Sequence, residues 1–229
     1  MIIINPYRFT SAASTLLTGL TASYSLNGNA LKNVGSNDGT ATNVTWGTGD
    51  ISGQCGVFNG TGYINIIDSS DFTFGSSDFA YSIRIKRGVS STHEIFVGQA
   101  APSGANTGVS WSLRFQADNS IGFAMIDNGI GVNYVDTGVQ ITDTNWHNIL
   151  VQRKGNVLEL YVDAVLSYSN SSFFTGKTIN NPTTQWGIGR VGELTVLFFT
   201  GSIQDNHLWN GRYLTSSEIT ELQTKRYPF

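Results

Sequence analysis

The sequence predicts an all-β protein, and three observations support this fold class. Only 13% of the 229 residues are charged, against about 25% in ordinary soluble domains, and Gly, Ser, Thr and Asn fill the difference. Alternating apolar and polar runs recur at roughly the 8–12-residue spacing of sandwich and barrel folds. The third observation is a hairpin pattern in residues 146–162. A chain of this length suits one all-β domain, since such domains reach about 200–250 residues.

The hairpin is the clearest local pattern in the chain. The runs Trp146–Arg153 and Val157–Val162 each alternate between two faces, and Lys154-Gly155-Asn156 joins them. Period-two alternation on both sides of a short loop that contains Gly predicts two antiparallel strands.

The other strands are predicted from the same alternation and from turn residues between the runs. In chain order they are Leu20–Leu26, Thr40–Trp46, Cys55–Phe58, Tyr63–Ile67, Phe79–Arg87, Glu94–Val97, Val109–Gln116, Ser120–Ile126, Ile130–Val135, Thr184–Arg190, Val196–Thr200 and Ile203–Trp209. In Phe79–Arg87 one face is expected in the core and the other in solvent. Ala101–Gly108 is expected to be a variable loop at the rim, and Ser167–Pro182 an irregular segment.

One short helix is expected near the end of the chain. Thr215 and Glu218 have the spacing of a capping box, in which the N-cap side chain and the N3 carboxylate bond each other's backbone amides. Ile219 and Leu222 then supply one apolar stripe.

The first residues differ from the rest, and we divide the chain into an arm, residues 1–18, and a domain, residues 19–229. A polar connector of small residues follows the aromatic residues of the arm, and a disordered tail would not need such large apolar groups. We therefore expect the arm to dock on its own domain or on a neighbouring subunit. The expected tether and partner contacts are Tyr7, Phe9, Tyr227 and Phe229.

Charge and apolar content argue against several partners. The net charge is −3 and Lys and Arg are scattered, so no basic stripe for nucleic acid is expected. The apolar start, Met1–Ile4, is too short for a signal-peptide core, and no run approaches the roughly 20 apolar residues of a membrane span. We expect a chain made in the cytoplasm without a signal peptide. Cys55 stands alone and is expected to be a small buried strand residue.

Several segments, taken together and in order, resemble the LamG-like jelly roll domain of the concanavalin A-like lectin/glucanase superfamily. They are Gly19–Ala30, Phe58–Ile64, Asp78–Ile83, Trp146–Asp163, Trp186–Gly189, Phe199–Ile203 and Leu214–Ile219. The resemblance implies a jelly-roll sandwich of two curved antiparallel sheets, with the one short C-terminal helix.

The hairpin departs from the family pattern at one position. The pattern has Gly after the turn residue Asp163, and this chain has Ala164. Because Gly relieves the strain of a positive φ, we expect a different or longer connection into Val165-Leu166.

The apolar arm also resembles the openings of LamG-like proteins encoded by tailed bacteriophages. This resemblance implies a non-enzymatic structural or adhesion protein of the virion, as a capsid decoration or tail component. Its expected partners are other virion proteins and host-surface glycans, and a homo-oligomer remains open. A free carbohydrate-binding, lectin-like module is the alternative.

No catalytic constellation is found. Glucanases of the superfamily carry an E-x-D-x-E motif that places carboxylates on one strand face, and this chain lacks it. Glu159 and Asp163 are four residues apart, without a third acid, so a glycoside hydrolase is the least favoured alternative. The three histidines, His93, His147 and His207, stand in no metal-binding motif.

The resemblance also implies a calcium site, which the sequence argues against. Lys32 stands where the family commonly has Asp, and Asp205 is the only acid of a late pair. Calcium needs hard oxygen ligands and a lysine repels it, so we expect no cofactor. The residual metal-ligand candidates are Asn27, Asn29, Asp38 and Asp205.

A glycan-binding surface is expected next to Ala101–Gly108. Trp111 and Tyr134 lie on alternating predicted strands, and the sequence leaves open which side of these strands is exposed. Flat aromatic side chains can stack on sugar faces, whereas surface aromatics more often mark protein contacts. These two residues are the candidate sugar platform.

Overall fold

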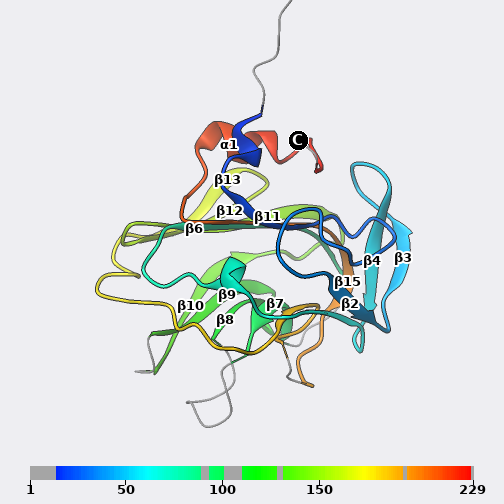
Figure 1. The fold of residues 1–229 in the computed structure, drawn as a ribbon, viewed down its shortest axis with the longest axis horizontal. Helices are drawn as coiled ribbons and strands as arrows, with labels where there is room; N and C mark the ends of the chain where they lie inside the picture. Colours follow the sequence, from blue (N-terminus) through cyan, green and yellow to red (C-terminus); the bar gives the residue numbers. More distant parts are fainter. Residues whose placement is uncertain (1–13, 89–92, 101–109, 128–130, 193–194, 228–229) are drawn as a thin grey trace, which may run out of the picture.

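The computed structural model describes residues 14–88, 93–100, 110–127, 131–192 and 195–227, which form two antiparallel sheets stacked face to face. Figure 1 shows the sheets in side view, with β6, β11 and β12 above and β7, β8, β9 and β10 below. The predicted all-β sandwich with one short C-terminal helix is confirmed.

The larger sheet contains eight of the described strands. Their order is β13-β12-β11-β6-β15-β4-β3, and β1 also pairs with β15. The bounds are β1 Leu20–Tyr24, β3 Thr45–Thr48, β4 Gln54–Asn59, β6 Phe79–Arg87, β11 Trp146–Lys154, β12 Val157–Val162, β13 Val165–Asn170 and β15 Thr200–Asn210.

The smaller sheet contains seven of the described strands, in the order β10-β9-β8-β7-β14-β5-β2. The bounds are β2 Gly39–Thr42, β5 Tyr63–Ile66, β7 Glu94–Gln99, β8 Trp111–Phe115, β9 Ser120–Asp127, β10 Gly131–Gln140 and β14 Trp186–Ile188. A 3-10 turn, η2 (Ser70–Phe72), precedes β6 in the chain.

Aromatic side chains fill the space between the sheets. Trp111 and Trp186, both from the smaller sheet, have ring centroids 5.0 Å apart, and Phe72 stacks on Trp186 at 4.7 Å. Phe79 and Tyr81 of the larger sheet meet Trp111 edge-on. Each such pair contributes about 0.5–1.5 kcal/mol of stability beyond the free energy gained by burying its surface, so these rings hold the two layers together. Cys55, buried and free, is a strand residue as predicted.

The predicted hairpin is present with the expected register. Lys154 pairs with Val157 and Ile149 with Val162, while Gly155 takes a φ of 61° in the loop. Ile149 and Val151 point into the main core, and Leu150 joins a second cluster on the opposite face of the sheet.

The turn after β12 corrects the prediction of a longer connection. Val162 pairs directly with Val165, so only Asp163 and Ala164 lie between the strands. Their φ angles are 51° and 63°, the left-handed pair that a two-residue hairpin turn requires. The tight turn is therefore kept with Ala in the place of Gly. Residues 167–170 of the segment predicted as irregular belong to the following strand, β13, whereas residues 171–182 form no strand, as predicted.

Thr40–Trp46 was predicted as one strand, but the chain passes between the sheets there. β2 lies in the smaller sheet and β3 in the larger one. Asn43 between them has a φ of 53°, a conformation that Asn tolerates better than most residues. Val196–Thr200 is likewise not a strand until Thr200, where β15 begins.

The outer face of the larger sheet is covered rather than open to solvent. The 3-10 turn η1 (Thr15–Leu17) and helix α1 (Ser216–Glu221) lie on it (Figure 1). Trp209 Nε1 donates to the Leu16 carbonyl at 2.7 Å, and Leu16 is fully buried. Residues 14–18 of the predicted arm thus pack on the domain. Residues 1–13, with Tyr7 and Phe9, lie outside the described residues, as does Phe229.

Helix α1 begins with the predicted capping box. Thr215 Oγ1 accepts from Glu218 N, and Glu218 Oε2 accepts from Thr215 N at 2.8 Å. Burial alone would raise the pKa of Glu218, but the amide of Thr215 and the side chain of Arg212 lower it to about 2. Within the described part of the chain, no helix has the length and apolar character needed to cross a membrane.

Candidate ligand-binding site

A polar pocket of about 150 Å³ opens at one end of the sandwich. It lies where β6 ends, where β9 begins and where the chain passes from β10 to β11. We call it the rim pocket, and its lining residues are Arg87, Gly88, Asn119, Ile141, Thr142, Asp143 and Thr144. Three segments far apart in the sequence therefore build one site.

Arg87 is the buried cation of the rim pocket. Its side chain is 3% exposed, and its guanidinium stacks on Phe115 at 4.3 Å from the ring centroid. Nη1 donates to Asn119 Oδ1 and to the Ile141 carbonyl. Nη2 has no hydrogen-bond partner among the described residues. Burial lowers the pKa of Arg87, and Glu94 opposes this shift.

Glu94 faces Arg87 but forms no ordinary hydrogen bond with its guanidinium. Arg87 Nε lies 3.5 Å from Glu94 Oε2, which is beyond an ordinary hydrogen bond. Burial raises the pKa of Glu94, while Arg87 and the amide of Thr200, 3.2 Å from Oε1, act in the opposite direction. The pair is buried and loosely matched, so the guanidinium keeps buried donors without a partner among the described residues.

Asp143 is the carboxylate of the rim pocket, and it belongs to a chain of three titratable groups. Its Oδ1 accepts from Asn145 N at 2.9 Å and lies 2.9 Å from His147 Nε2. His147 Nδ1 lies 2.7 Å from Asp163 Oδ2. Burial would lower the pKa of His147, yet the hydrogen bonds to the two carboxylates raise it above its ordinary value. The His147 hydrogen bond in turn lowers the pKa of Asp143.

The remaining lining groups are neutral and polar. Asn119 has a φ of 70° and turns its amide oxygen toward Arg87. Thr142 and Thr144 are exposed on the loop that carries Asp143. The pocket thus combines donors, an ionised acceptor and hydroxyl groups, a set suited to a hydroxyl-bearing ligand.

The predicted sugar platform of Trp111 and Tyr134 is not formed. Trp111 has no exposed surface and lies in the main core, because its strand turns that face inward. Tyr134 pairs with Ala124 on the outer face of the smaller sheet. It is 38% exposed, and the Arg114 guanidinium lies 4.1 Å from its ring centroid. Trp111 is therefore removed as a sugar-contacting residue, and Tyr134 stays a prediction. Ala101–Gly108 lies outside the described residues.

The predicted metal-ligand candidates are engaged by protein groups. Asp38 Oδ1 lies 3.2 Å from Lys32 Nζ, and Asp205 lies 3.1 Å from Arg226 Nε. Asn27 Oδ1 accepts from Gln54 N, and Asn29 Oδ1 accepts from Leu31 N. Among the described residues, no group of three or more His, Cys, Asp or Glu side chains is placed to hold a metal ion. These side chains do not fit a calcium ion.

Arg226 fastens the end of the chain to the larger sheet. Its Nη2 donates to the Ser25 carbonyl at 2.6 Å and its Nη1 to the Ser52 carbonyl. Burial raises the pKa of Asp205 to about 6, although Arg226 favours its ionised form. Tyr227, a predicted partner contact, packs partly against the second hydrophobic cluster, which contains Leu16 and Trp209.

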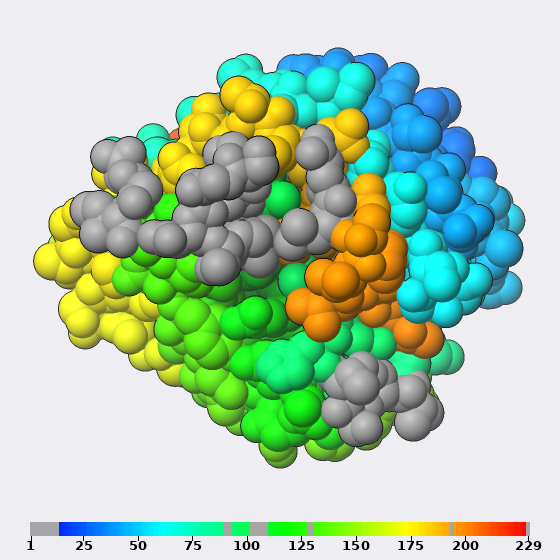
Figure 2. All heavy atoms as spheres, turned by 90° about the horizontal axis from the view of Figure 1, so that it is seen from below, coloured from blue at the N-terminus to red at the C-terminus, as the bar shows by residue number. Residues whose placement is uncertain are grey.

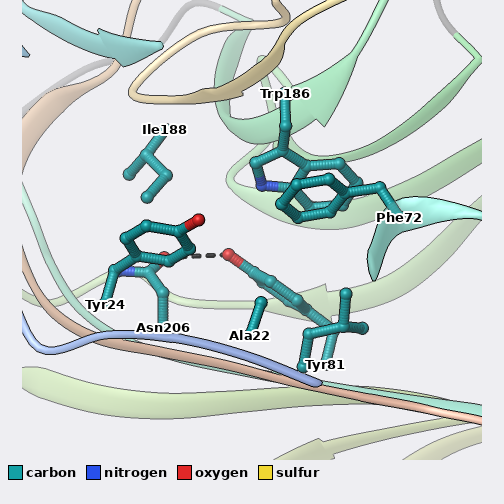
Figure 3. A pocket seen from close by; sticks show the side chains of 8 residues that line it. Ala22, Tyr24, Phe72, Tyr81, Trp186, Ile188 and Asn206 are labelled. Carbon is teal, nitrogen blue, oxygen red and sulfur yellow. Dashed lines mark hydrogen bonds between the residues drawn. The ribbon is translucent and has the colours of Figure 1, made fainter. Parts of the chain in front are cut away.

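A second hollow lies between the sheets and is part of the core. Figure 3 shows its lining, with Phe72 stacked on Trp186 and the Tyr81 hydroxyl donating to Asn206 Oδ1 at 2.8 Å. Its volume of about 10 Å³ matches one water molecule. Asn206 Nδ2 is buried there without a partner among the described residues. The cavity is too small for a sugar.

Another aromatic group lies on the outer face of the smaller sheet. Figure 2 shows that face, where orange atoms from late in the chain lie beside cyan atoms from its first third. The Arg190 guanidinium lies 3.5 Å from the Tyr63 ring centroid, and Tyr63 and Phe198 are 6.1 Å apart. Because Arg190 already covers a face of Tyr63, this group is less open to a sugar than the rim pocket.

Sequence reasoning missed Arg87, Asn119 and Asp143 as site residues. One signal for Arg87 was present, since it follows Phe79, Tyr81, Ile83 and Ile85 on the inward face of its strand. A charged side chain at an inward position next to a strand end marks a cleft or a buried pair.

Comparisons with known proteins agree with the fold. Residues 58–220 match the family Laminin_G_3, described as the concanavalin A-like lectin/glucanases superfamily. Domain 4 of AbnA, a GH43 extracellular arabinanase from Geobacillus stearothermophilus in complex with arabinotriose, is similar with a TM-score of 0.70 and 19% identity. The alignment covers 89% of this chain and 98% of that one. Among curated proteins, none matches the sequence.

The binding domains of two toxins are also similar in fold. The binding domain of Paraclostridial Mosquitocidal Protein 1 has a TM-score of 0.70 at 14% identity, and that of Botulinum neurotoxin serotype G has 0.67 at 16%. Both alignments cover 89% of this chain but only 51% and 50% of those chains. This chain thus spans about half of their length, and the likeness is one of fold.

Proposed function

The chain belongs to the concanavalin A-like lectin/glucanases superfamily, and we propose that it binds a carbohydrate at the rim pocket without cleaving it. The observation that carries the proposal is the buried Arg87 guanidinium, whose Nη2 lacks a partner among the described residues, beside the exposed Asp143 carboxylate. Sugar hydroxyl groups donate and accept at once, so they complement both groups. The structure of the similar AbnA domain in complex with arabinotriose supports the proposal of carbohydrate binding.

The proposal that no bond is cleaved rests on how the acids are engaged. Glu159 Oε2 accepts from Gln152 at 2.7 Å and from Tyr161 at 3.0 Å. Asp163 is bonded to His147 and to Asn148 N. Glycoside cleavage needs two carboxyl groups facing one scissile bond, and here each of these acids serves a separate hydrogen-bonded contact.

A glycan array and titration calorimetry test the binding. Thr142→Arg places a long side chain in the mouth of the pocket, and Thr224→Arg makes the same change at an exposed threonine near the end of the chain. We expect wild type and Thr224→Arg to bind the same glycans and Thr142→Arg to lose them. A wild type silent across the array contradicts the proposal. Release of reducing ends from a bound glycan contradicts its non-enzymatic part.

A second candidate function is attachment to a phage particle, and it is favoured by where the described ends lie. Leu16 and Tyr227 both contact the second hydrophobic cluster under α1, on the outer face of the larger sheet (Figure 1). We propose that residues 1–13 join a capsid or tail protein on this side. The smaller sheet would then face outward, toward host-surface glycans.

Removal of residues 1–13 tests the attachment. We expect the shortened protein to stay folded and to stop co-sedimenting with particles. The double variant Tyr7→Ala, Phe9→Ala should behave in the same way. Tyr134→Ala changes an exposed aromatic residue on the outer face of the smaller sheet and should attach normally. Full attachment without residues 1–13 overturns this second proposal and leaves the first untouched.

A further inference from the structure

We infer that the rim pocket selects uncharged sugars over acidic ones, and that His147 is the positioning residue that holds Asp143 as the acceptor for the sugar hydroxyl groups. The inference deepens the proposed carbohydrate binding and rests on it. It is drawn from charge, from unused hydrogen-bonding capacity and from the two contacts of one histidine.

The charges around the pocket disfavour an anion. The carboxylate of Glu94 already lies 3.5 Å from Arg87 Nε, so a negative charge of the protein faces this cation before any ligand binds. Asp143 adds a second carboxylate at the opening, and its side chain is 51% exposed. An acidic sugar would bring its own negative charge next to Asp143, and like charges at close range cost free energy. A neutral sugar meets no such repulsion.

The unused hydrogen-bonding atoms complement a pair of hydroxyl groups. Arg87 Nη2 donates to no described residue. Asn145 N and His147 Nε2 both bind Oδ1 of Asp143, which leaves Oδ2 as an acceptor. One hydroxyl group accepting from Arg87 and another donating to Asp143 would satisfy both. Hydrogen bonds to charged groups are stronger than those between neutral groups, so these two contacts can decide between ligands.

His147 determines whether Asp143 is held in place. Both ring nitrogens contact carboxylates, Nδ1 that of Asp163 and Nε2 that of Asp143. Only the protonated ring donates from both nitrogens, so loss of its proton removes one of the two bonds. Asp163 is also held by Asn148 N at 2.9 Å. Asp143 has an equivalent bond only from Asn145 N, two residues further on its own loop, whereas Asn148 belongs to β11. Asp143, also the more exposed of the two at 51% against 44%, is therefore the one released.

The side chain opposite His147 on β6 is the apolar Ile85. Arg87 follows two residues later on the same face of that strand, and Glu94 faces it at 3.5 Å. The charged groups that act on its ring are Asp163, from the β12–β13 turn, and Asp143, from the loop before β11. Their hydrogen bonds raise the pKa of His147, so the arrangement persists at mildly acid pH and is lost at alkaline pH.

The test measures binding by calorimetry at pH 5.5, 7 and 8.5, with neutral glycans and with glycans that carry a carboxylate or sulfate. We expect wild type to prefer neutral glycans and to weaken about tenfold at pH 8.5, the loss of one such bond. Asp143→Asn should bind at least tenfold more weakly at pH 5.5. His147→Gln should bind weakly with no pH dependence.

The controls are matched in chemistry. Asp38→Asn changes another exposed aspartate that pairs with a cation, and His93→Gln changes an exposed histidine. Both should bind as wild type does, with the wild-type pH profile. Preference for acidic glycans overturns the inference, as does a pH profile that survives in His147→Gln. Binding that tolerates Asp143→Asn but is lost in Thr142→Arg overturns the inference and keeps the proposed function. A wild type that binds no glycan overturns both.

Discussion

His147 Nδ1 lies 2.7 Å from Asp163 Oδ2, and this contact joins the start of β11 to the turn after β12. Asp163 Oδ1 accepts from Asn148 N at 2.9 Å, so one turn residue binds two adjacent residues of β11. The same histidine reaches Asp143 through its other nitrogen. The hairpin that identifies the fold thus extends, through one side chain, to the rim pocket.

His147→Gln should lower stability more at acid than at alkaline pH. The folded-state pKa of His147 is raised above its ordinary value by Asp143 and Asp163, against the effect of burial. A raised histidine pKa stabilises fully below the unfolded pKa of about 6.5, and this contribution is lost as pH rises through the folded pKa. Because the groups are partly exposed, we expect a loss of roughly 0.5–1 kcal/mol at pH 5.5, measured by urea denaturation.

His93→Gln is the control for that measurement, since His93 is exposed. Its unfolding free energy should follow that of wild type at both pH 5.5 and pH 8.5. An equal loss for His147→Gln at the two pH values would show that the histidine acts by packing and not by charge.

Ala164→Gly should stabilise the protein. Ala164 has a φ of 63°, and left-handed backbone costs an L-residue roughly 1–2 kcal/mol that Gly does not incur. Ala164 also packs partly on the second hydrophobic cluster, so loss of its methyl group offsets some of the gain. We expect a net increase of roughly 0.5 kcal/mol in the free energy of unfolding.

Ala41→Gly provides the contrast, because Ala41 lies in β2 and its φ is not positive. Glycine there adds only unfolded-state entropy and should lower stability. If Ala164→Gly also proves less stable than wild type, the backbone at this turn carries little strain.

The fold was largely predictable because its signals are local. The hairpin is fixed by alternation and by Gly155, which takes the φ of 61° its loop requires. The break at Asn43 was not predictable in this way, because residues 40–46 alternate throughout while the chain changes sheets in the middle. Tertiary pairing, rather than strand propensity, decides that position.

The site was less predictable, since alternation divides a strand into two faces without telling which is inward. Trp111 was therefore assigned to the surface, whereas it lies at the centre of the core. Arg87, Asn119 and Asp143 come together only through the ends of strands in different sheets. No spacing of residues in the sequence predicts that these three side chains lie together.

Thr215→Ala should destabilise the protein by about 1 kcal/mol, the usual cost of removing an N-cap. Thr215 Oγ1 accepts from Glu218 N, and α1, with six residues, is too short to form without tertiary contacts and caps. Thermal unfolding measures the effect, with Thr224→Ala as an exposed control. An unchanged melting temperature would mean that packing of Ile219 and Leu222 alone holds the helix.

Arg226→Met should destabilise the protein, and more at pH 8 than at pH 5. Asp205 is buried and 3.1 Å from Arg226 Nε, and removing one partner of a buried ion pair costs about 3–5 kcal/mol. Burial raises the pKa of Asp205 to about 6 even with Arg226 present. At pH 5 the carboxyl is largely protonated and tolerates the loss of the cation, whereas at pH 8 it is left ionised and buried.

The direction in which the stability of wild type changes with pH follows from the same raised pKa of Asp205. A carboxyl whose folded pKa is raised from 3.8 to about 6 stabilises most below pH 3.8, and its contribution falls as pH rises to about 6. Without Arg226 the pKa rises further, so the decline extends to higher pH. Lys225→Met is the matched control, because Lys225 pairs with Glu221 at the surface and exposed pairs contribute under about 1 kcal/mol. Urea denaturation at pH 5 and pH 8 measures the loss in the free energy of unfolding for each variant. An equal loss for Arg226→Met at the two pH values would contradict the prediction. It would mean that Arg226 acts through its hydrogen bonds to Ser25 and Ser52 and not through its charge next to Asp205.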